Sequence, residues 1–261
     1  MRTHIFFILG VLLFALPVSA GNAGLSSTIF LPEDELTLPP LLKEIQSEDE
    51  PEDRVNLKGL DHHEHNAHQG EWLDFGDTIS VPARLSFQII QKENIQWVGG
   101  GVFTGQIGSG RSVKDDNVHE VRLTRGWMKA WVKPNALHST FRVITNAGNF
   151  VTSNAVFWLY SRVDHTEVYL LSGELKMEAS KKSFRDKGYA IFEKGAKEPL
   201  YVSTDWAPKA IEVKIAGSYP HFVKLVDRAE EQWDDGWAEK TYATFRKKGW
   251  RKASRLDPST K

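Results

Sequence analysis

The sequence predicts a mainly β protein that ends in a helical segment. Apolar and polar residues alternate in short runs between about residue 71 and residue 206, and glycine, proline and asparagine separate these runs. After residue 220 the apolar residues change to helical spacing. Short alternating runs between turn residues are typical of all-β domains. We therefore expect a β domain over residues 70–206 and a helical segment over residues 207–261.

The first twenty residues have the pattern of a secretory signal. One arginine, Arg2, precedes the apolar run Ile5–Val18, and the small-residue site Val18-Ser19-Ala20 follows. The run is shorter than the ~20 apolar residues that a membrane span needs, so we expect cleavage before Gly21 rather than a retained anchor. The prediction is a periplasmic or secreted protein with no membrane span after cleavage.

Composition excludes several classes of function. The formal net charge is −1, and nucleic-acid binding usually shows as a strong basic excess. The chain contains no cysteine, so neither a disulfide nor a catalytic thiol is possible. We expect no nucleic acid among the partners.

Residues 21–69 are predicted to be an acidic flexible segment. Two stretches, 31–35 and 47–53, are acidic and contain or adjoin proline, with few residues that form a core. The short apolar piece Leu36–Ile45 separates them. We expect this piece to dock on the main domain at most and to have no independent fold.

The β domain is predicted from its alternating runs and from the turns between them. The clearest runs are Val121–Thr124, Phe141–Thr145, Glu167–Leu170 and Glu174–Met177. Turn residues are expected at Gly99–Gly101, Gly105, Gly108–Gly110, Gly126, Pro134–Asn135, Asn146–Gly148 and Ser172–Gly173.

The C-terminal segment is predicted to be helical and amphipathic. One face of a helix is defined by a set of apolar residues at helical spacing: Phe222, Leu225, Val226, Ala229 and Trp233. Gly236 interrupts the pattern, and a second helix is expected from Trp237 to about Gly249, followed by a basic tail.

Three stretches of the β domain, in matching order and spacing, resemble the FecR-type domain of bacterial iron-dicitrate regulators. They are Trp72–Ile79, Val121–Val132 and Phe141–Leu175. The resemblance implies a compact, solenoid-like β domain of short strands. The chain departs from the family pattern at Asn146, where proline is usual, and at Asn154-Ala155, where Gly-Thr is usual. Because asparagine tolerates positive φ next best after glycine, we expect both asparagines to keep the turn geometry.

The resemblance also bears on function. Signalling members of the family place a sigma-factor-binding part and a membrane helix before this domain, whereas here the chain starts with the signal. We therefore expect no direct sigma-factor control. Stand-alone exported members look like binding or scaffold modules, so a non-enzymatic binding role in the cell envelope is expected. The alternative is a sensing component that acts through other proteins.

A histidine-rich stretch, residues 61–68, is the candidate metal site. Its four histidines, His62, His63, His65 and His68, together with two carboxylates, are ligands suited to Zn²⁺, Ni²⁺ or Cu²⁺. The competing interpretation is a polar linker enriched in histidine by chance. A metal-binding envelope protein or enzyme is thus a further alternative, with a divalent transition metal as its cofactor.

Catalytic motifs are not found. Gly108-Ser109-Gly110 lacks the remainder of a nucleophile elbow, and no histidine–aspartate pair is marked for it. The glycine-rich stretch 99–110 lacks the Lys-Ser/Thr ending of a phosphate loop. We expect neither catalytic residues nor an organic cofactor.

The C-terminal aromatic residues have two interpretations. Trp233, Trp237, Phe245 and Trp250 either cap the β domain or bind a partner with the basic tail. In the second case the partner would be an envelope protein, an anionic lipid or a cell-wall polymer.

Overall fold

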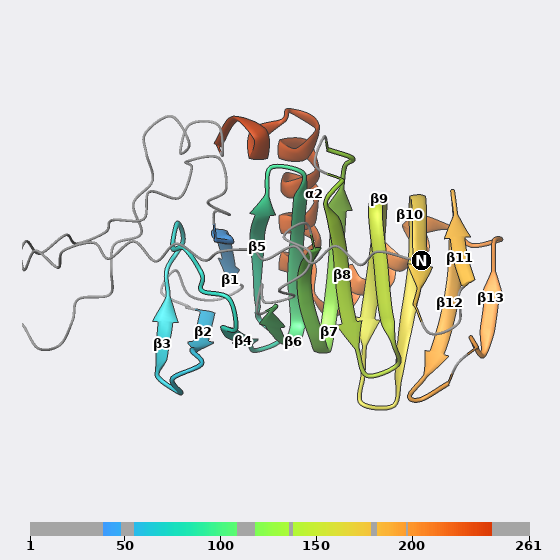
Figure 1. The fold of residues 1–261 in the computed structure, drawn as a ribbon, viewed down its shortest axis with the longest axis horizontal. Helices are drawn as coiled ribbons and strands as arrows, with labels where there is room; N and C mark the ends of the chain where they lie inside the picture. Colours follow the sequence, from blue (N-terminus) through green and yellow to red (C-terminus); the bar gives the residue numbers. More distant parts are fainter. Residues whose placement is uncertain are drawn as a thin grey trace, which may run out of the picture. The chain divides into compact units, whose positions relative to one another are not determined.

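β-Strands make up just over half of the described chain, and the longest of them lie at the centre of the sheet (Figure 1). The computed structural model describes residues 39–47, 55–108, 118–135, 138–178, 182–196 and 198–241. These residues belong to one unit, Leu38–Lys261. The predicted signal lies outside the described residues. The mainly β class with C-terminal helices is confirmed.

Among the described residues the strands are β1 Leu41–Ser47, β2 Val55–Lys58, β3 Glu64–Ala67, β4 Thr78–Val81, β5 Leu85–Lys92, β6 Ile95–Ile107, β7 Val118–Val132, β8 Thr140–Thr145, β9 Asn149–Ser161, β10 His165–Met177, β11 Lys182–Arg185, β12 Gly188–Glu193 and β13 Tyr201–Ser203. The helices are α1 Pro208–Ser218 and α2 Pro220–Asp234.

All thirteen strands of the described chain join one open sheet. Its order is β13-β12-β10-β9-β8-β7-β6-β4-β2-β3, with β5 on β6, β1 on β5 and β11 on β10. The β7–β8 pairing is parallel, and the other pairings among these strands are antiparallel. The strands therefore form a largely sequential antiparallel sheet instead of the stacked solenoid coils that the resemblance implied.

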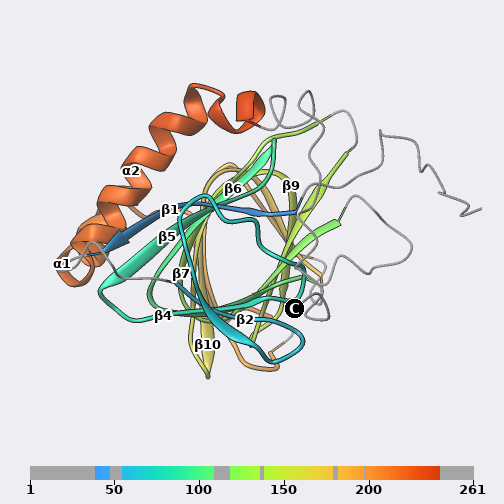
Figure 2. The ribbon, with the colours of Figure 1, turned by 90° about the vertical axis from the view of Figure 1, so that its left-hand side faces the viewer.

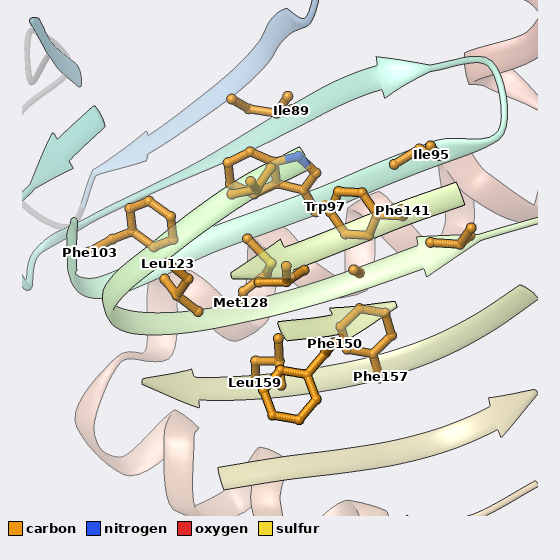
Figure 3. Packing of buried hydrophobic residues seen from close by; sticks show 14 of the residues in the cluster. Ile89, Ile95, Trp97, Phe103, Leu123, Met128, Phe141, Phe150, Phe157 and Leu159 are labelled. Atoms are coloured by element: carbon orange, nitrogen blue, oxygen red, sulfur yellow. The ribbon is translucent and has the colours of Figure 1, made fainter. Parts of the chain in front are cut away.

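One face of the sheet curls around a large apolar core (Figure 2). Strand alternation sends every second side chain inward, and Trp97, Phe103 and Phe157 are among the largest of the fully buried ones. Figure 3 shows these side chains meeting between the strands. Phe103 stacks on Trp97 with ring centroids 5.9 Å apart. Burial of such aromatics is a major source of stability.

The opposite, outer face of the sheet is covered in part by α2. The predicted apolar face of this helix is confirmed, because Phe222, Leu225, Val226, Ala229 and Trp233 are all buried. Phe222 packs edge-on against Trp158 of β9 at 5.8 Å between ring centroids. Residues 237–241 are again helical, as expected for the start of the second helix, and residues 242–249 of that prediction lie outside the described residues.

Several glycines predicted to form turns lie inside long strands. Gly100 belongs to β6, and a Cβ at this position would lie 2.8 Å from the Phe222 ring of α2. Gly173 belongs to β10 with φ +84, and the register of β10 with β9 shifts beside it. Gly100 permits the close approach of a helix, and Gly173 permits the close approach of strand β9, because a Cβ there would lie 2.2 Å from the Asn154 carbonyl oxygen. Positions predicted as turns between short strands therefore lie within long strands.

The prediction of a flexible segment over residues 21–69 is wrong for the described part of that segment. Strands β1, β2 and β3 all lie within it. Leu42, Val55 and Leu57 are fully buried in the inner core. The docking expected for the apolar piece is confirmed at β1, which pairs with β5. Four-residue strands have too little periodicity to stand out locally, and pairing with distant strands stabilises them.

The two asparagines do not behave as expected. Within the described residues, positive φ outside glycine occurs at His62, Val102, His138 and Asp186. Asn154 lies within strand β9. Asn146 lies at a turn, and its side-chain amide donates to the carbonyl oxygens of Thr124 and Arg162 at 3.1 and 3.0 Å. Asn146 therefore joins neighbouring hairpins and does not supply a left-handed residue.

Candidate binding site

An open pocket of about 590 Å³ lies where β10 begins and β12 ends. These two strands lie far along the sheet from β3, as Figure 1 shows. We call it the β10–β12 pocket. Its lining residues come from the turn before β10, from β12 and from the loop after β12. They are Val163, Asp164, His165, Ile191, Glu193, Lys194 and Leu200.

Strand register brings these separate segments together. His165 pairs with Glu193 across β10 and β12. The loop after β12 then returns, because the Leu200 amide donates to the Ile191 carbonyl oxygen at 2.8 Å. The Lys194 amide donates to the Asp164 carbonyl oxygen, also at 2.8 Å. Backbone hydrogen bonds thus fix both the floor and the two walls of the pocket.

The floor of the pocket carries a histidine between two carboxylates. His165 Nδ1 lies 2.9 Å from Asp164 Oδ1, and its Nε2 lies 3.6 Å from Glu167 Oε1. The pKa of Asp164 is lowered, by a hydrogen bond with its own backbone and by the hydrogen bond with His165. The imidazole is therefore held in one orientation, with its side chain 22% exposed.

The rim of the pocket combines exposed apolar and charged side chains. Val163 is 70% exposed and Leu200 is 67% exposed, which is high for branched apolar residues. Glu193 and Lys194 are also exposed. Among the described residues, neither of these two side chains has an oppositely charged partner within 4.0 Å. Together with Asp164, the pocket thus offers two carboxylates, one ammonium group and an apolar surface to a ligand.

A row of aromatic rings continues from the pocket across the outer face. Trp127 stacks on Tyr160 at 4.2 Å, and Tyr169 stacks on Tyr189 at 4.5 Å. The Tyr169 hydroxyl donates to Glu167, and burial, followed by this contact, raises the pKa of Tyr169. Because these rings stack on one another, they form a rigid base beside the pocket.

Arg162 contacts this aromatic row at Tyr160. Its guanidinium lies 4.9 Å from the Tyr160 ring centroid, and its Nε donates to the Tyr160 hydroxyl at 2.7 Å. That hydrogen bond is the main cause of the raised pKa of Arg162. The cation is thus held against the ring, next to the turn that supplies Val163 and Asp164.

The predicted metal ligands lie on the β2–β3 hairpin at the other end of the sheet. His62, His63 and His68 are exposed, and His65 is half-buried. His65 Nε2 lies 2.8 Å from Glu71 Oε1. In the described part of the chain, no group of three or more metal-ligating side chains converges. Metal binding by these histidines stays a prediction.

Of the four aromatic residues predicted to bind a partner, the structure describes two, Trp233 and Trp237. Trp233 is buried at 5% exposure between α2 and the sheet, as capping of the β domain requires. Trp237 is half-buried, with Lys43 Nζ 4.1 Å from its ring centroid. Phe245 and Trp250 lie outside the described residues. Whether any of them binds a partner stays a prediction.

Sequence reasoning missed the β10–β12 pocket. Its residues lie in three separate segments, and no motif marks any of them. The alternating run at Glu167–Leu170 predicts a strand but does not indicate which strand pairs with it. Only the pairing of β10 with β12 creates the pocket, and that register is non-local.

Comparison with known proteins gives only distant likenesses. No protein-family profile and no curated protein matches the chain. Two crystal structures, each described as a "putative anti-sigma factor" from Parabacteroides distasonis ATCC 8503, are similar in part. One has a TM-score of 0.43 and 15% identity over 52% of this chain and 62% of the other. The second has a TM-score of 0.35 and 16% identity over 54% and 62%. The chain spans less than two thirds of each, and these low scores decide nothing about function.

The helices of the described chain include none long and apolar enough to cross a membrane.

Proposed function

We propose that this protein is a non-enzymatic, exported, FecR-like module that binds another component of the bacterial cell envelope. The predicted signal supports export, and the order of the three FecR-like stretches supports the family. The β10–β12 pocket supplies the contact. Its rigid backbone, exposed apolar rim and unpaired charges are the features of a preformed recognition site.

The observation that carries this proposal is the exposure of Val163 and Leu200, at 70% and 67%, in the lining of one pocket. Exposed aliphatic side chains contribute favourable free energy when a ligand covers them. Both are held by hydrogen-bonded turns, so little conformational entropy is lost on binding. A binding role therefore needs no rearrangement of the fold.

Site-specific crosslinking tests the proposal, because the chain has no cysteine. A Val163→Cys variant carrying a short photoreactive maleimide is incubated with an isolated envelope fraction and irradiated. The matched control is Leu60→Cys, whose native side chain is 69% exposed on the β2–β3 hairpin. We expect a defined adduct from position 163 and none from position 60. Equal labelling from both positions, or from neither, overturns the proposal.

The adduct also separates binding from sensing. An adduct with wall polymer supports a binding or scaffolding role, whereas an adduct with one specific envelope protein supports a sensing component that acts through that protein. The two outcomes differ in mass and in sensitivity to wall-degrading enzymes.

Metal binding is the second candidate function, favoured by the 2.8 Å contact between His65 Nε2 and Glu71 Oε1. Two ligands already face each other there, and three histidines lie within six residues of His68. The purified protein is loaded with Zn²⁺, dialysed and assayed for retained metal. Retention that is lost when His62, His63, His65 and His68 are changed to Ala supports the site, and equal retention by that variant removes it.

A further inference from the structure

The unpaired charges of the β10–β12 pocket restrict the chemistry of its ligand. β12 ends at Glu193, and Lys194 begins the following turn, so consecutive residues contribute an anion and a cation to the lining of the pocket. In the described chain neither forms an ion pair with another side chain. A ligand that carried only negative charge would meet Glu193 and Asp164. A ligand that carried only positive charge would meet Lys194.

The apolar part of the pocket lies beside these charges. Ile191 is half-buried, Val163 and Leu200 are exposed, and all three line the pocket. An uncharged sugar would leave both Glu193 and Lys194 without a counter-charge and would place hydroxyl groups against aliphatic walls. The aromatic rings that sugars usually stack on are already stacked on one another in the neighbouring row.

We propose that the β10–β12 pocket binds a short aliphatic peptide that bears both a free amino group and a free carboxylate, such as the peptide part of a cell-wall polymer. The amino group pairs with Glu193, the carboxylate pairs with Lys194, and the aliphatic stem lies between Val163 and Leu200. This assignment rests on the proposed envelope-binding function and names the class of ligand for the same site.

His165 positions the acidic side of the pocket. Its ring lies 2.9 Å from one carboxylate oxygen of Asp164 and 3.6 Å from Glu167 Oε1. The Asp164 side chain is 79% exposed, so it also faces the ligand. Glu193, which forms no ion pair within the described chain, is the carboxylate that we assign to the ligand amine. Asp164 adds a negative potential nearby, which favours the ammonium group on that side of the pocket.

The test measures binding of the full mature chain to a soluble wall-type tripeptide, alanyl-γ-glutamyl-diaminopimelate, by isothermal titration. Three further probes are the same peptide with its amines acetylated, the peptide with its carboxylates amidated, and a wall glycan free of peptide. We expect the unmodified peptide to bind, each blocked peptide to bind at least about tenfold more weakly, and the glycan not to bind.

Charge-neutralising variants show which residue meets which group. Glu193→Gln is expected to weaken binding of the free peptide about tenfold and to leave binding of the acetylated peptide unchanged. Lys194→Gln is expected to weaken binding of the free peptide about tenfold and to leave binding of the amidated peptide unchanged. Glu231→Gln and Lys214→Gln on the two helices are matched exposed controls and should bind like the parent protein. The assignment is overturned if both pocket variants bind the free peptide as tightly as the parent protein does. It is also overturned if the parent protein binds the glycan as tightly as the peptide.

Failure of the peptide assignment is distinguishable from failure of the envelope-binding role. If Val163→Cys crosslinks to an envelope component while the tripeptide does not bind, the pocket is a recognition site for another ligand. If neither occurs, both the assignment and the proposed function are wrong.

Discussion

Lys129 Nζ lies 3.0 Å from Glu230 Oε2, and this ion pair joins the centre of the sheet to helix α2. The lysine is 1% exposed, whereas Glu230 is 45% exposed. Glu212 of α1 lies 3.9 Å away on another side. The ammonium also lies 4.9 and 5.2 Å from the ring centroids of Trp131 and Trp158. One buried cation thus contacts both helices and two aromatic rings, so it orients the helical cover on the sheet.

Removing the acidic partner is predicted to cost more than removing the cation. Glu230→Gln leaves Lys129 buried with only the more distant Glu212, so we expect a loss of about 1–2 kcal/mol in the free energy of unfolding. That is below the ~3–5 kcal/mol for a fully buried pair, because Glu230 is half exposed. Lys129→Met keeps the aliphatic stem and removes the charge, so its cost should stay within about 1 kcal/mol. Urea denaturation measures both.

The double variant checks the cause of this difference. Glu230→Gln should cost little once Lys129 is Met, because no buried charge remains to be compensated. If the loss from Glu230→Gln is the same in both backgrounds, the carboxylate acts through the helix and not through the lysine.

Trp233 and Trp237 are predicted to differ in what they contribute. Trp233 is buried against the sheet, with Lys133 Nζ 4.5 Å from its ring centroid, so Trp233→Ala should destabilise the fold by about 3–5 kcal/mol. Trp237 is half-buried beside Lys43, whose pKa is lowered chiefly by burial. Trp237→Ala should cost less than half as much.

Thermal unfolding and envelope binding, both measured on these two variants, show whether the C-terminal aromatic residues cap the β domain or contact a partner. If Trp237→Ala keeps its stability but loses envelope binding, the C-terminal aromatics form an interface. If it keeps both, the β10–β12 pocket remains the only candidate contact among the described residues.

Local periodicity was enough to predict α2 and parts of β7, β8 and β10, because each presents one continuous face to a core. Local periodicity failed where contacts between distant parts of the sequence determine burial or strand pairing. Lys129 resembles a surface lysine in the sequence, but in the fold it is 1% exposed beside the carboxylates of α1 and α2. Gly173 has the sequence context of a turn, yet it pairs with Ala155 inside β10, and the register shifts lie on either side of it. Val163 and Leu200 line one pocket because their segments both pair with β12 or the turn after it, and no local pattern encodes that pairing.

His119 is predicted to make the stability of the fold depend on pH. It is 4% exposed, and its Nε2 has no hydrogen-bond partner in the described chain. Burial, and secondarily the charge of Lys92, lower the pKa of His119 from 6.5 to about 4. The unfolded chain therefore binds more protons between pH 6.5 and pH 4. Stability should be greatest above pH 6.5 and should fall by about 3 kcal/mol as the pH drops to 4.

A His119→Gln variant isolates this effect, because it lacks the titrating group while other groups titrate as before. Urea denaturation at pH 7.0, 5.5 and 4.5 should show the stability difference between the two proteins changing in favour of the variant as pH falls. A constant difference across that range would show that His119 is not the titrating group.

Asn146 is predicted to stabilise the fold through its side-chain amide and not through its backbone. The amide donates to the carbonyl oxygens of Thr124 and Arg162, which belong to two other segments. Asn146→Ala removes both exposed bonds and should cost about 1 kcal/mol. Asn146→Asp places an acceptor against two acceptors and should cost more, about 1–2 kcal/mol.

Asn154→Ala is the matched control, because Asn154 is exposed on β9 and should change stability by less than about 0.5 kcal/mol. If the proline usual in the FecR pattern were equivalent to Asn146, Asn146→Pro would be tolerated. We expect it to lose at least as much as Asn146→Ala, since proline cannot donate to either carbonyl. Because Arg162 is followed directly by the pocket turn, ligand affinity measured on the same variants would show whether this cross-link also holds Val163 and Asp164 in place.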